Sequence, residues 1–181
     1  MGNDASTARR GPPDDGGSAL ASLRAVVADD EALIRECLAS LLEDSGLTVV
    51  GRAGNAVELL ALVREQSPDV VVVDIRMPPT HTTEGLDAAW VIRRELPDTG
   101  ILVLSAHVDV EDAMELLASG RGIGYLLKSR VSDFTDFVDT LQQIANGASV
   151  VDPAVVANWY RDPAETIRCR CFRRASWRCW R

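Results

Sequence analysis

Chemically active side chains stand directly after short apolar stretches of this chain. The clearest case is Asp74, which follows four consecutive valines at 70–73. Such a β-branched run is typical of a strand buried on both faces of a parallel sheet. Ligands of open α/β sheets bind at the carboxyl ends of the strands, so Asp74 stands where a site is expected, although an Asp there can also simply cap the next helix. The other such side chains are Asp29, Asp30, Ser105 and Lys128.

Three carboxylates brought to one place would bind a hard cation. Asp29, Asp30 and Asp74 would repel one another, and Mg²⁺ is satisfied by a few carboxylates, water and a phosphoryl oxygen. The backbone carbonyl of Arg76 could add a further ligand. Asp74 could also attack phosphorus as a nucleophile and form an acyl phosphate. The residue types therefore point to phosphoryl transfer.

Ser105 and Lys128 would complete such a site. A hydroxyl can donate to a phosphoryl oxygen, and an ammonium group supplies a point charge. Taken singly, each has an ordinary explanation, Ser105 as a cap at a strand end and Lys128 as a solvated charge. Their joint occurrence at the ends of predicted strands favours the phosphoryl site.

The apolar pattern predicts five strands that alternate with five helices. We expect strands at 23–28, 47–51, 70–73, 101–104 and 123–127, a fourth helix that opens at Asp109, and a last helix from Phe134 to Ala145. This alternation indicates a doubly wound α/β fold, a five-stranded parallel sheet of the flavodoxin-like (βα)5 type with strand order 2-1-3-4-5. That order places the ends of strands one, three, four and five around one crevice.

The helices also carry expectations about burial. The first helix shows Leu33, Cys37 and Leu38 within an apolar pattern, so we expect Cys37 to be a core residue rather than a reactive thiol. Val57 is expected on the apolar face of the second helix.

Composition and charge exclude several classes of protein. The net charge is −8, and residues 167–181 hold six Arg and no acid, so the remainder carries −14. Residues 1–166 are too acidic to bind nucleic acid well, because their negative charge repels the phosphate backbone. No apolar run approaches the roughly 20 residues that span a bilayer, and no signal sequence is apparent, so we expect a cytoplasmic protein without membrane contact.

Residues 24–152 resemble the receiver domain of bacterial two-component response regulators, on the motifs V-V-A-D-D-E, V-V-V-D-I-R-M-P, V-L-S-A and Y-L-L-K-S. The resemblance implies that a sensor histidine kinase phosphorylates Asp74 and that Asp29 and Asp30 bind Mg²⁺. It also implies that Ser105 and Lys128 sense the phosphoryl group, that Tyr125 is the switching aromatic, and that phosphorylation favours a homodimer.

The segment 78–85 looks like that of the LuxR-type (NarL/FixJ) transcription regulators. Its His81 is expected to serve loop packing rather than catalysis.

We expect a disordered leader at 1–22, the receiver at 23–147, and the start of a linker at 148–166. LuxR-type proteins continue into a helix-turn-helix domain, for which this chain has no room, so DNA binding is expected to be lost.

The tail at 167–181 has three explanations. Cys169, Cys171 and Cys179 could bind a metal, although paired C-x₂-C spacing is absent. Six Arg with two Trp could bind nucleic acid. The third explanation, which we favour, is a frameshift. Read one nucleotide earlier with GC-rich codons, the tail can encode P-R-E-L-E-V-L-A-L, which resembles the start of the LuxR-type DNA-binding domain.

The sequence thus predicts a phosphoacceptor signalling protein, not an enzyme, derived from a LuxR-type regulator of transcription truncated before its DNA-binding domain. One alternative is a stand-alone receiver that signals through protein contacts. Another is a Mg²⁺-dependent phosphatase with Asp74 as nucleophile. Phosphatases of the haloacid dehalogenase type need a second Asp two residues later, where this chain has Arg76, which argues against that alternative.

Overall fold

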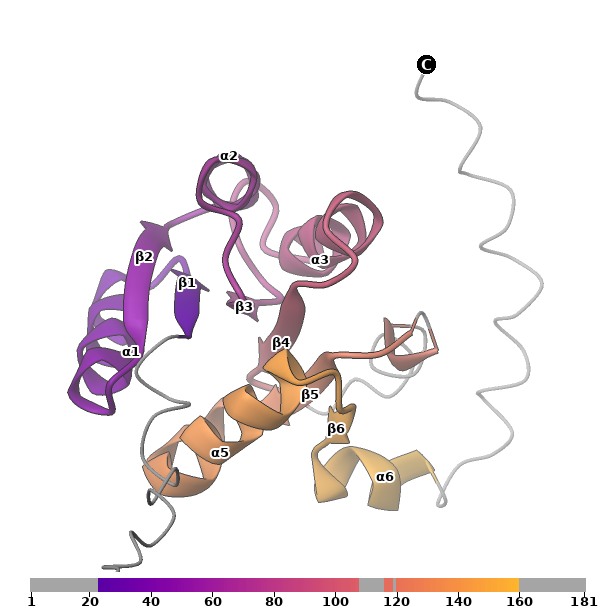
Figure 1. Cartoon of the computed structure of the whole chain (residues 1–181). Helices are drawn as coiled ribbons and strands as arrows, with labels where there is room; N and C mark the ends of the chain where they lie inside the picture. The colour runs from indigo at the N-terminus through magenta and orange to yellow at the C-terminus, as the bar shows by residue number, and fades with distance from the viewer. Residues whose placement is uncertain (1–22, 108–115, 119, 160–181) are drawn as a thin grey trace, which may run out of the picture.

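A computed structural model describes residues 23–107, 116–118 and 120–159 of the chain. Its centre is a parallel sheet with strand order β2-β1-β3-β4-β5-β6 (Figure 1). The strands are β1 (Arg24–Ala28), β2 (Thr48–Ala53), β3 (Val70–Asp74), β4 (Gly100–Ser105), β5 (Ile123–Leu127) and β6 (Val150–Val151).

Helices cover both faces of this sheet. On one face α1 (Ala32–Asp44) and α5 (Phe134–Ala145) pack on the strands, and on the other α2 (Ala56–Gln66) and α3 (Glu84–Glu95) do so. A 3₁₀ turn, η3 (Lys128–Ser132), follows β5, and α6 (Pro153–Trp159) follows β6. None of the helices in the described ranges is long and apolar enough to cross a membrane.

The valines of β3 build the core on both sides of the sheet. Val71 and Val73 belong to the cluster under α2 and α3, whereas Val70 and Val72 belong to the cluster under α1 and α5. All four are fully buried, because side chains alternate between the faces of a strand and both faces are covered here. The prediction of a central strand ending at Asp74 is confirmed.

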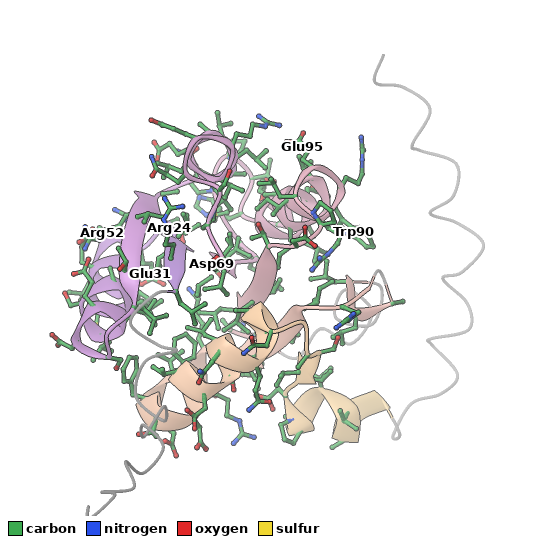
Figure 2. The ribbon with its side chains drawn as sticks, in the orientation of Figure 1. Arg24, Glu31, Arg52, Asp69, Trp90 and Glu95 are labelled. Atoms are coloured by element: carbon green, nitrogen blue, oxygen red, sulfur yellow. The ribbon has the colours of Figure 1, made fainter. Side chains whose placement is uncertain are left out.

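The opposite end of the sheet is closed by polar contacts. The backbone N–H of Arg24, at the start of β1, donates to Asp69 Oδ2 at 2.7 Å, and the Arg24 guanidinium donates to the Gln66 carbonyl, also at 2.7 Å. Arg24 and Asp69 are labelled in Figure 2. These contacts join the beginning of β1 to the turn before β3.

The α/β class and the order 2-1-3-4-5 are confirmed, and a sixth strand extends the sheet. Tyr125 of β5 pairs with Val151 of β6. A strand of two residues has no detectable period, so the pattern did not reveal it. The helix predicted from Asp109 begins within residues 108–115, outside the described ranges, and its residues 116–117 are helical. The leader 1–22 and the tail 167–181 also lie outside the described ranges.

Three predictions of burial were wrong. Leu33 is 84% exposed, Val57 is 79% exposed, and Cys37 is exposed. The helix α1 buries the stripe that holds Leu38 and Leu42, and Leu33 and Cys37 lie one position earlier in each turn, rotated by about 100°. Val57 likewise faces away from Leu59, the buried residue of its turn.

Candidate functional site

The carboxyl ends of β1, β3 and β5 bring together four of the five side chains that the sequence singled out, Asp29, Asp30, Asp74 and Lys128. Asp29 and Asp30 follow β1, and Asp74 is the last residue of β3. One carboxylate oxygen from each lies within 4.8 Å of the others. Since neighbouring parallel strands end at the same edge, strand order alone produces this cluster.

Lys128 binds two of these carboxylates. Its ammonium Nζ lies 2.8 Å from Asp29 Oδ2 and 3.2 Å from Asp74 Oδ2. Asp29 and Asp74 are both buried, and the lysine side chain is 19% exposed. Lys128 contacts two of the three carboxylates, and one ammonium group cannot neutralise all three when they are ionised. A divalent cation would neutralise the remaining charge.

Asp29 is fixed from two sides. Its Oδ1 accepts a hydrogen bond from the backbone N–H of Glu31 at 2.9 Å. Its backbone carbonyl accepts one at 2.7 Å from the guanidinium of Arg35, which lies in the first turn of α1. Arg35 is a contributor that sequence reasoning missed, because this contact over six residues depends on where the guanidinium points, which the residue type alone does not show.

Burial raises the pKa of the Asp74 carboxyl, and the charge of Asp29 raises it further, against the opposing pull of Lys128 and of a hydrogen bond from the Arg76 backbone. Burial also disfavours the charged form of Lys128, but contacts with Asp29 and Asp74 outweigh it and raise the lysine pKa. Burial is thus the main cause of the rise at Asp74, whereas contact with the two carboxylates causes the rise at Lys128 against the effect of burial.

The donors present suit magnesium. The cluster of possible ligands consists of carboxylate oxygens, which are the ligands that Mg²⁺ prefers. The backbone of Arg76 lies at Asp74, to which its N–H donates. A place for the Arg76 carbonyl in the ligand set stays a prediction. An acidic cluster of Asp29, Asp30 and Asp74 is typical of the magnesium site of a receiver domain.

Ser105 and Tyr125 meet at one backbone carbonyl. The Ser105 hydroxyl donates to the His107 carbonyl at 2.7 Å, and the Tyr125 phenol donates to the same oxygen at 3.3 Å. The Tyr125 ring is fully buried. The His107 backbone was missed from the sequence, because nothing in its residue type marks a carbonyl that two hydroxyl groups share.

The loop between β3 and α3 is held by Glu84. Its carboxylate accepts hydrogen bonds from the backbone N–H groups of Thr80 at 3.0 Å and Thr82 at 2.9 Å, and from the Thr80 hydroxyl. Burial raises the pKa of the Glu84 carboxyl, but these hydrogen bonds outweigh it and lower the pKa to about 2. In the same loop, His81 Nδ1 lies 3.3 Å from Asp30 Oδ2, so His81 reaches a site residue, and its expected role in loop packing stays a prediction.

Gly85 lets α3 begin directly against the end of β3. Its N–H donates to the Ile75 carbonyl at 2.9 Å. A Cβ atom on Gly85 would lie only 1.8 Å from the carbonyl oxygen of Asp74. A glycine is therefore required here by close approach of two backbones, and the site depends on it.

Comparison with known proteins agrees with this geometry. The family described as "Response regulator receiver domain" matches residues 25–142. The transcriptional regulatory protein YxjL of Bacillus subtilis is 31% identical over 149 residues, which are 82% of this chain and 64% of that protein. The probable transcriptional regulatory protein NarL of Mycobacterium tuberculosis is 37% identical over 136 residues, 74% of this chain and 60% of that protein.

A solved structure shows the same fold. The crystal structure of a LuxR-family two-component response regulator from Aurantimonas sp. is 26% identical and superimposes with a TM-score of 0.67, over 78% of this chain and 98% of that one. The chain spans less than two thirds of the length of the curated relatives named above. On the match of the family, the fold and the acidic cluster, the chain belongs to the response regulator receiver domain family.

Proposed function

We propose that this chain accepts a phosphoryl group on Asp74 from the phosphohistidine of a sensor kinase, in the presence of Mg²⁺. The observation that carries the proposal is the position of Lys128, whose ammonium contacts both Asp29 and Asp74 at the carboxyl ends of the strands. Asp29, Asp30 and Asp74 would hold the cation, with the Arg76 carbonyl as a further ligand. Bound Mg²⁺ would supply positive charge to the phosphoryl oxygens.

The transfer needs one nucleophile and one leaving group. A carboxylate oxygen of Asp74 attacks phosphorus, a P–O bond forms, and the P–N bond to the kinase imidazole breaks with its electron pair kept by nitrogen. The Asp74 carboxylate faces the cluster and is held by Lys128 and the Arg76 N–H, so its orientation is set before the donor arrives.

The hydroxyl of Ser105 then changes partner. In the unphosphorylated structure this hydroxyl donates to the His107 carbonyl. A phosphoryl oxygen on Asp74 would be a stronger acceptor because it is charged. Lys128 moves toward the same group, since phosphorylation adds about −1.5 to −2 charge. The Tyr125 ring is already inside, so we expect its phenol to exchange partner at His107 rather than swing inward. The resulting change in this region would favour a homodimer.

We propose that this receiver belongs to a regulator whose output is control of transcription, because the relatives named above are transcriptional regulators. The frameshift hypothesis for residues 167–181 stays a prediction, since the tail lies outside the described ranges. The nucleotide sequence around codon 166 tests it. A continuous frame for a helix-turn-helix domain one nucleotide away would support the hypothesis, and the absence of such a frame would refute it.

The phosphoacceptor is tested with acetyl phosphate and Mg²⁺. The parent chain should gain the mass of one phosphoryl group, and Asp74→Asn should gain none, because an amide is not a nucleophile here. The matched control is Asp69→Asn, which changes an acid at the opposite end of the sheet and should be phosphorylated like the parent. Full phosphorylation of the Asp74→Asn protein would refute the proposal.

A further inference from the structure

The loop between β3 and α3 carries one side chain to the edge of the acidic cluster. His81 Nδ1 lies 3.3 Å from Asp30 Oδ2, and the histidine is 54% exposed while Asp30 is 24% exposed. The backbone of His81 has a φ of 54°, in the left-handed region. Gly or Asn would adopt this conformation at least as easily, so the backbone alone does not explain a histidine here.

This loop has little freedom to move His81 away. The His81 N–H donates to the carbonyl of Met77, a fully buried residue, at 3.1 Å. The Glu84 carboxylate accepts from the N–H groups of Thr80 and Thr82 on either side of His81. The imidazole is thus presented to Asp30 by a backbone fixed before, at and after the histidine.

We propose that His81 is a positioning residue for the divalent-cation site, which holds the Asp30 carboxylate in place among the three. The inference rests on the proposed function, because it treats Asp30 as a ligand of Mg²⁺. In the structure His81 contacts Asp30 while one carboxylate oxygen each of Asp29, Asp30 and Asp74 lies within 4.8 Å of the others. The contact is therefore compatible with the arrangement that a cation needs.

His81 acts from outside the set of ligands. Among the described residues, the group whose atoms lie close enough to share one ion holds the three aspartates and no histidine. Outer partners of metal ligands fix the orientation of the ligand, and their loss weakens metal binding by about 10–100-fold. Because His81 is more than half exposed, we expect the lower end of that range.

The test is Mg²⁺ binding to the full chain, measured by calorimetry for three variants. His81→Gly keeps the left-handed backbone and removes the side chain, so its Kd for Mg²⁺ should rise about tenfold. His81→Asn also tolerates this backbone and retains a polar group that can reach Asp30, so its Kd should stay within about threefold of the parent value. Arg64→Ala is the matched control, since Arg64 is 55% exposed and pairs with Glu95 away from the site, and its Kd should not change.

A second measurement separates positioning from general damage. In phosphorylation by acetyl phosphate, His81→Gly should need about tenfold more Mg²⁺ for half-maximal rate, while the rate at saturating Mg²⁺ stays that of the parent. An unchanged Kd for Mg²⁺ in His81→Gly, or an equal rise of that Kd in His81→Asn, would overturn the role of His81 and leave the proposed function standing. Failure of the parent chain to bind Mg²⁺ would refute the proposed function as well.

Discussion

Substitution of Gly85 by alanine should damage both stability and phosphoryl transfer, because α3 begins against the backbone of β3. The new Cβ would lie 1.8 Å from the Asp74 carbonyl oxygen and 2.8 Å from its carbonyl carbon. Cβ atoms essentially never approach a heavy atom closer than 3.0 Å, so the two backbones must separate by about 1.2 Å. Neither atom belongs to a side chain that could rotate away.

The size of both effects follows from this displacement. Overpacking of a well-packed interior costs about 1–3 kcal/mol, and we expect the upper end because backbone must move. A displacement of about 1 Å in a reacting group can slow a reaction about 100-fold. Gly85→Ala should therefore lose about 3 kcal/mol of unfolding free energy and phosphorylate Asp74 about 100-fold more slowly.

Urea unfolding and initial rates with acetyl phosphate measure the two effects. The control for stability alone is Gly54→Ala, whose Cβ would meet side-chain atoms and no backbone, Arg35 Nη1 at 3.3 Å and Glu58 Oε2 at 3.7 Å. Its stability should stay within about 1 kcal/mol of the parent. Parent-like stability and rate in Gly85→Ala would refute the idea that this close approach positions Asp74.

Three further predictions concern charge and capping. Burial and the charge of Asp29 raise the pKa of Asp74 in the folded state, so the stability contributed by the protonated carboxyl is lost as pH rises through that pKa. Asp74→Asn should therefore unfold at a higher temperature than the parent at pH 7 without Mg²⁺. A lower unfolding temperature would contradict this prediction. The pKa of Glu84 is lowered to about 2, so the stability that its carboxylate contributes is present above the ordinary pKa of a glutamate and is lost as pH falls toward 2. Glu84→Gln should therefore lower the free energy of unfolding in urea by about 1 kcal/mol at pH 7 and by less at pH 3. An equal loss at both pH values would contradict this prediction. Asp152 is fully buried, accepts hydrogen bonds from the N–H groups of Ala154 and Leu127, and pairs with Arg130 at 3.1 Å. Asp152→Ala should therefore speed amide exchange in α6 and lower the free energy of unfolding by about 2 kcal/mol. Unchanged amide exchange in α6 would exclude a capping role for Asp152.

The sequence was sufficient for the fold and for the meeting of the acidic residues. Four valines before Asp74 define a central strand, and the alternation of strands and helices fixes which strand ends are neighbours. The placement of Asp29, Asp30, Asp74 and Lys128 follows from those two facts. Such inferences succeed where a local pattern and the topology act together.

Other features depend on contacts that no local pattern records. Cys37 lies beside the buried stripe of α1 rather than in it, and a rotation of one residue around a helix decides between core and surface. The approach of Gly85 to Asp74 and the sharing of the His107 carbonyl arise only when segments meet in space. The β6 strand is too short to carry a period.

The central claim is that Asp74 itself receives the phosphoryl group. The most direct measurement is peptide mapping by mass spectrometry of the parent chain after incubation with acetyl phosphate and Mg²⁺. We predict one acid-labile phosphoryl group, on a peptide that spans 70–76, and its absence when Mg²⁺ is removed by a chelator. A phosphoryl group on Ser105, on Asp29 or on any residue other than Asp74 would contradict the account.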